Sequence, residues 1–175
     1  MNKFQIGPLF MVWIALMLAA CSASPYGADD GAYALTTYTN TEMGFRTVVP
    51  QYWQQTDSTH RLRAADERDL TVLIQMSLMG LTRAEVEVVG KQEMDLEEFP
   101  SQEGSYDSDY LAWELYDFNF FNYYDGLVGV KMGIAEGEDA WYTVLACGDS
   151  REVRKAESYY ETLFMHVLYN FEPLE

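Results

Sequence analysis

The chain has 175 residues, of which 49% are hydrophobic and 15% aromatic, so it is neither disordered nor too short for a core of its own. With 11 basic and 28 acidic residues its formal net charge is −17, which repels phosphate backbones and anionic lipid headgroups. We therefore expect no nucleic-acid partner and no polybasic membrane contact. In the simplest interpretation the acidity serves solubility, and in the alternative it attracts a cation or a basic partner.

The first twenty residues have the features of an export signal. Lys3 is the only charged residue before Cys21, and an uncharged run extends from residue 4 to residue 20. The run ends in Leu18-Ala19-Ala20-Cys21, where two small residues precede the cysteine. These four positions resemble the lipobox of bacterial lipoproteins. The resemblance implies that a diacylglycerol is attached to the Cys21 thiol and that residues 1–20 are removed as a signal peptide.

An uncleaved membrane anchor is the alternative interpretation of this segment. A membrane span needs roughly 20 apolar residues, whereas this run is somewhat short and no positive cluster follows it. Residues 21–31 are small and polar, which is typical of a flexible tether. We therefore expect a lipid-anchored, extracytoplasmic protein on the cell membrane or on an outer membrane. Ser22, directly after the cysteine, resembles outer-membrane sorting signals.

Residues 32–175 are expected to form a single domain. Apolar alternation and turn residues predict strands at 33–39, 45–49, 60–64, 70–78, 110–120, 128–134 and 140–147. Thr82 and Glu85 have capping-box spacing and predict a helix over 83–97, followed by a loop at 100–108. Asp149 opens a second helix that ends before Pro173. Because hairpins join many of the strands, we expect an α+β fold, a mostly antiparallel sheet covered by helices.

Three segments of this domain carry motifs whose order along the chain is informative. The strand within 44–53 opens with Gly-Phe, ends at a proline and is followed by a tryptophan. A later strand begins Trp141-Tyr142-Thr143-Val144, and an amphipathic helix through 159–164 leads to a closing aromatic, Phe171. In this order the segments resemble the PsbP-like family. The resemblance implies an α/β/α sandwich and an accessory or binding role rather than catalysis, and it carries over no catalytic residue.

No catalytic, metal or nucleotide motif is evident in the sequence. Asp107 and Asp109 lack the glycine and the glutamate of a calcium loop, which leaves a solvated loop, or alternatively a weak cation site. His60, His166 and one free cysteine are too few and too scattered for zinc. Cys147 ends an apolar strand and is expected to be buried and inert. We therefore expect no cofactor, no metal, no nucleotide and no catalytic residue.

Aromatic residues crowd the stretch from residue 106 to residue 124. Alternation places Trp113 on one face of a strand and Tyr116 on the other, and a sheet covered on both sides buries both sets. The residues at the hairpin tip cannot all be buried in a turn, and exposed aromatics beside acids suit a protein or glycan contact. The candidate binding residues are Phe121, Tyr123, Tyr124 and Asp125.

Three hypotheses for the function follow. The leading one is a membrane-anchored binding or accessory module without catalysis, whose partner is an envelope protein. The alternative is an envelope hydrolase that uses two facing acidic residues, one with a raised pKa. The third is a purely structural domain within a larger complex.

Overall fold

The computed structural model describes residues 34–51, 53–56, 61–64, 72–122, 126–151 and 157–174. The chain divides into two compact units, Met1–Gly31 and Ala32–Glu175, and every described residue belongs to the second unit. The expected signal peptide, the tether and Cys21 therefore lie outside the described residues. The same holds for Tyr123, Tyr124 and Asp125 at the hairpin tip.

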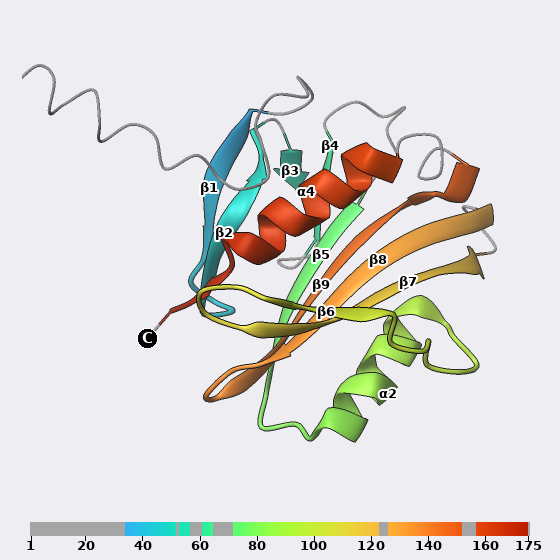
Figure 1. The fold of residues 1–175 in the computed structure, drawn as a ribbon, viewed down its shortest axis with the longest axis horizontal. Helices are drawn as coiled ribbons and strands as arrows, with labels where there is room; N and C mark the ends of the chain where they lie inside the picture. The colour runs from blue at the N-terminus through green and yellow to red at the C-terminus, as the bar shows by residue number, and fades with distance from the viewer. Residues whose placement is uncertain are drawn as a thin grey trace, which may run out of the picture. The chain divides into compact units, whose positions relative to one another are not determined.

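Two antiparallel sheets organise the second unit (Figure 1). The larger sheet has seven strands in the order β3-β4-β5-β9-β8-β7-β6, and each neighbouring pair is antiparallel. Its strands are β3 (Trp53–Gln55), β4 (Arg61–Ala64), β5 (Val72–Met79), β6 (Gly104–Asp107), β7 (Ala112–Asn122), β8 (Gly126–Glu136) and β9 (Ala140–Asp149). The smaller sheet has the order β1-β2-β10, with β1 (Leu35–Asn40), β2 (Phe45–Pro50) and β10 (Glu172–Pro173).

Helix α4 (Glu157–Tyr169) contacts β2 of the smaller sheet and β8 and β9 of the larger one (Figure 1). Leu168 on this helix packs so closely over Gly133 that a Cβ there would lie 3.1 Å from a Leu168 methyl carbon. The Thr47 hydroxyl donates a buried hydrogen bond of 2.8 Å to the Val167 carbonyl oxygen. Glycine on β8 therefore permits the close helix–sheet approach, and a buried hydrogen bond joins the smaller sheet to the same helix.

Helix α2 (Arg83–Met94) packs against the opposite face of the larger sheet. Its Val86 and Met94 belong to one buried apolar cluster with Met132, whereas the next residue on the strand, Gly133, faces α4. Successive residues of a strand point to opposite faces. The two helices therefore contact opposite faces. The sheet residues of this cluster are Ile74, Met76, Tyr116, Val128, Val130, Met132, Ile134 and Leu145.

The sequence predicted the two described helices and most of the long strands, with three differences. The loop expected at 100–108 contains strand β6, an exposed, polar segment that pairs with β7 along the edge of the sheet. Strands β3 and β10 were not predicted, because two or three residues are too short for a visible alternation. Helix α2 ends at Met94 and not at residue 97, because Asp95 adopts a left-handed conformation with φ 54°.

Candidate binding surface

The β7–β8 hairpin positions the candidate surface. In its register Phe121 pairs with Leu127 and Asn122 pairs with Gly126. Directly paired residues of an antiparallel ladder have their side chains on the same face, close enough to touch. Phe121 is 73% exposed and Leu127 is 46% exposed. The open end of the hairpin therefore presents two apolar side chains side by side to solvent, which we call the tip pair.

The sequence predicted one member of the tip pair and missed the other. Phe121 is exposed as expected, while Tyr123, Tyr124 and Asp125 lie outside the described residues, so their role stays a prediction. Leu127 was not among the candidates. Its signal was present in the sequence, because a hairpin centred on residues 123–125 places residue 127 opposite residue 121.

Below the tip, the hairpin is held to α4 by a buried lysine. The Lys131 Nζ lies 2.6 Å from an Asp117 carboxylate oxygen on β7 and 2.7 Å from a Glu161 carboxylate oxygen on α4. Burial by itself lowers the pKa of Lys131, but the hydrogen bonds to Asp117 and Glu161 outweigh it and leave this pKa raised. The lysine therefore stays charged, and it ties three elements together on the face that carries the tip pair.

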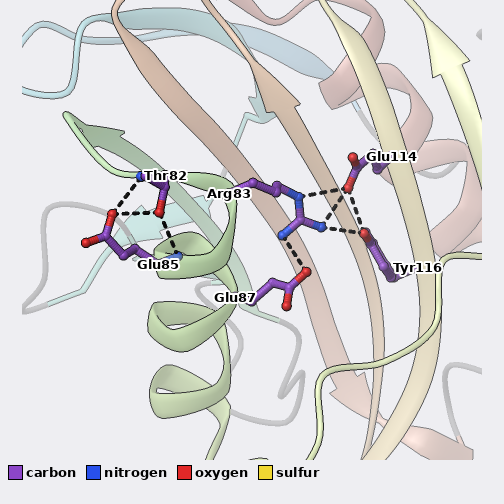
Figure 2. A network of polar contacts seen from close by, with 6 residues as sticks. All are labelled: Thr82, Arg83, Glu85, Glu87, Glu114 and Tyr116. Atoms are coloured by element: carbon purple, nitrogen blue, oxygen red, sulfur yellow. Dashed lines mark hydrogen bonds and ion pairs between the residues drawn. The ribbon is translucent and has the colours of Figure 1, made fainter.

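A second polar cluster lies at the start of α2 (Figure 2). The Arg83 guanidinium donates to one Glu114 carboxylate oxygen from Nε at 3.1 Å and from Nη2 at 2.7 Å. Its Nη2 also donates to the Tyr116 hydroxyl at 2.7 Å, and that hydroxyl donates to Glu114 at 2.7 Å. The Nη1 atom lies 3.1 Å from a Glu87 carboxylate oxygen. Arg83, Glu114 and Tyr116 are thus engaged with one another within the protein.

The electrostatics of the Arg83 cluster do not suit acid–base catalysis. Burial tends to raise the pKa of Glu114, but hydrogen bonds from Arg83 and Tyr116 hold it below its usual range. Burial, together with the hydrogen bond to Glu114, raises the pKa of Tyr116 to about 12. A general acid in a hydrolase needs a carboxyl group with a raised pKa. Glu114 has the opposite shift, so this cluster gives the hydrolase hypothesis no support.

Of the other candidates for chemistry, His166 is buried, and Cys147, which was expected to be buried, is half-buried. Burial raises the pKa of the Cys147 thiol to about 12, and burial lowers the pKa of His166. Within the described part of the chain, no group of three or more His, Cys, Asp or Glu side chains is arranged to hold a metal ion. Among the same residues, no helix is long and apolar enough to cross a membrane.

Charge is distributed unevenly over the described residues. Most of the described cations are engaged in ion pairs with acids, namely Arg46 with Glu172, Arg61 with Glu93, Arg83 with Glu114, Lys131 with Glu161 and Arg151 with Asp149. The chain carries 28 acidic residues against 11 basic ones. The formal net charge of the whole chain therefore remains −17 despite these pairs.

These observations define a small α+β domain with an apolar hairpin tip. The chain is similar to the solution structure of cyanobacterial PsbP (CyanoP) from Synechocystis sp. PCC 6803, with 16% identity and a TM-score of 0.55, over 86% of this chain and 99% of that one. This likeness shows a shared fold.

Two further solved structures resemble the chain more weakly. LpqN, involved in cell envelope biogenesis of Mycobacterium tuberculosis, matches with 11% identity and a TM-score of 0.48 over 83% of this chain and 94% of its own. PA94 from Pseudomonas aeruginosa, a protein of unknown function and putative regulator, has 13% identity and a TM-score of 0.37, over 74% of this chain and 92% of its own. No family model and no curated protein matches the sequence.

Proposed function

We propose that this protein is a lipid-anchored, extracytoplasmic binding or accessory module without catalytic activity, and that it contacts an envelope protein through the β7–β8 tip. The observation that carries this proposal is the exposed tip pair, Phe121 and Leu127, on a hairpin anchored by Lys131. Exposed aromatic and aliphatic side chains that lie together favour protein contacts. Tyr123, Tyr124 and Asp125 complete the proposed surface between them.

The proposed anchor is the lipidated Cys21, which places the domain on the surface of the cell membrane or of an outer membrane. The positive start, the apolar run and the lipobox support this location. We further infer that α2 and α4 cover the two faces of the larger sheet as layers of an α/β/α sandwich. A filled sheet of this kind leaves hairpin ends and edges as the surfaces for contact.

Site-specific photocrosslinking in the envelope tests the proposed surface. A benzophenone amino acid at position 121 of the full-length chain should give a discrete adduct, and Leu127→Ser should abolish it. The matched control carries the same amino acid at position 110, because Tyr110 is also aromatic and is 55% exposed. Equal adducts at both positions, or an adduct that survives Leu127→Ser, would rule out the tip as the contact.

The anchor is tested separately by intact mass. Membrane-extracted wild-type protein should match residues 21–175 plus acyl groups, and Cys21→Ser should lack that species. If the wild-type chain is found unprocessed, the lipid anchor is ruled out and an N-terminal membrane helix becomes the inferred anchor.

A further inference from the structure

Helix α2 covers the apolar face of the larger sheet with little burial of its own. Of the residues on α2, Val86 and Met94 are buried, and the remainder are partly or fully exposed. The sheet face below is far more apolar than the helix that covers it, since eight sheet residues contribute to the buried cluster. Packing of an apolar stripe is the usual source of a helix's stability in a protein. Leu81, Leu96 and Phe99, which flank the helix, pack against the same cluster, and polar contacts at its two ends add to them.

The polar contacts are two arginine clusters, one at each end of the helix, which we call the latches. At the first turn, Arg83 reaches Glu114 and Tyr116 of β7, and its guanidinium carbon lies 5.5 Å from the centroid of Phe99 and 5.8 Å from that of Trp141. In the last turn of the helix, Glu93 forms an ion pair with Arg61 of β4.

Solvent reaches both latches. The side chains of Arg83 and Glu114 are 25% and 36% exposed, and those of Arg61 and Glu93 are 41% and 25% exposed. Partly exposed ion pairs are weak and are screened by salt. The latches therefore hold α2 by interactions that can be released without disturbing the sheet.

The backbone on either side of α2 is suited to hinge motion. Gly80, between β5 and the helix, has φ 68°, and a Cβ there would have no atom within 4 Å. Asp95, the C-cap of the helix, has φ 54°, the left-handed conformation in which helices commonly end. Hinges are a few residues at the ends of elements that absorb changes in φ and ψ. Two such residues bracket α2.

We propose that α2 is a hinged cover, which opens as a unit about Gly80 and Asp95 before the rest of the domain unfolds and uncovers the apolar face of the sheet. The two latches set how often it opens. This device is independent of the tip pair, which lies on the other face of the sheet. It gives the domain a second apolar surface that is present only in the open form.

Cys147 is a built-in reporter of this opening. It lies on the covered face, packs against the buried cluster, and has Arg61 and Glu93 of the second latch in its electrostatic surroundings. With Cys21→Ser it is the only cysteine of the chain. Burial suppresses the thiolate, which is the form that reacts with disulfide reagents. Because Cys147 is partly exposed, labelling of the closed form sets a baseline rate, and the increase above that baseline reports the opening of α2.

The test measures the labelling rate of Cys147 with excess 5,5′-dithiobis(2-nitrobenzoate) in the full-length Cys21→Ser chain, at urea concentrations below the unfolding transition. Arg83→Gln should accelerate labelling by about tenfold, although this residue is at the far end of the helix from Arg61. Arg46→Gln, which removes a partly exposed ion pair with Glu172 elsewhere, is the matched control and should leave the rate unchanged. A second measurement is the rate of amide hydrogen exchange in α2, taken in the Cys21→Ser chain with both latches intact.

We expect the labelling rate of Cys147 and the exchange rate of the α2 amides to rise only weakly with urea concentration, because local opening exposes less surface than unfolding. It is overturned if Cys147 is labelled and the α2 amides exchange with the same urea dependence as the amides of β8 and β9. It is equally overturned if Arg83→Gln and Arg46→Gln change the labelling rate alike.

Discussion

Lys131 on β8 and Glu161 on α4 form an ion pair with Nζ and the carboxylate oxygen 2.7 Å apart, and the lysine side chain is only 9% exposed. Glu161 is half exposed, so solvent stabilises its charge even without the lysine. The pair therefore positions α4 on the hairpin more than it stabilises the fold, since the cost of desolvating a buried ion pair often cancels the attraction between its charges.

Replacing this lysine by an apolar residue of similar length should be tolerated. We expect Lys131→Met to change the free energy of unfolding by less than about 1 kcal/mol, whereas Lys131→Ala, which also leaves a void, should cost about 2 kcal/mol. Urea denaturation of both variants measures the difference. A cost above about 3 kcal/mol for Lys131→Met would mean that the two carboxylates are not adequately solvated without their cation.

The tip pair should contribute to binding and not to stability. Because both side chains are exposed, Phe121→Ser and Leu127→Ser should each change the free energy of unfolding by less than about 0.5 kcal/mol while reducing photocrosslinking from the neighbouring position. Thermal unfolding followed by circular dichroism checks the first statement. Trp113→Ala provides the contrast, because this buried side chain should cost about 3–5 kcal/mol. A large loss of stability from either tip variant would identify the pair as part of the core.

Gly133→Ala should destabilise the interface between β8 and α4. The added Cβ would lie 3.1 Å from carbon atoms of both Leu168 and Trp113, and neither neighbour is free to withdraw in a packed core. We expect a cost of about 1–3 kcal/mol, measured by urea denaturation. Leu168→Ala in the same chain makes room on one side, so the double variant should be more stable than the sum of the two single costs predicts.

Stability should fall as the pH decreases below the usual pKa of histidine, in part because of His166. Burial lowers the pKa of His166 in the folded state, so the unfolded chain takes up a proton at a higher pH than the native one. The stabilising contribution is present above about pH 6.5 and is lost as the pH falls from there through the folded pKa.

The measurement is urea denaturation between about pH 7.5 and pH 5.5 for wild type and His166→Asn. The variant is expected to be less pH-dependent over this interval, whatever its absolute stability. Identical slopes for the two proteins would assign the dependence to other groups.

Patterns that lie within a short stretch of the sequence predicted the start of α2 and the buried face of β8. The Thr82–Glu85 capping box is present with both of its reciprocal hydrogen bonds, because its partners are only three residues apart. The alternation of Val128, Val130, Met132 and Ile134 marks the face of β8 that packs against α2. Gln75 shows the limit of such patterns. It alternates with the apolar residues of β5 and so lies on the opposite face, yet it is fully buried, as is Leu73 on the same face.

By itself, the sequence determined the strand and helix periods, the helix start at Thr82, the antiparallel α+β class and the exposed Phe121, since each depends on residues close together in the chain. The tertiary structure decided which strands became neighbours, and so it placed Glu114 beside Arg83 and Glu93 beside Arg61. It also made an edge strand of residues 104–107. These outcomes depend on contacts between distant segments, whose free energy comes from packing and desolvation and leaves no periodic trace in the chain.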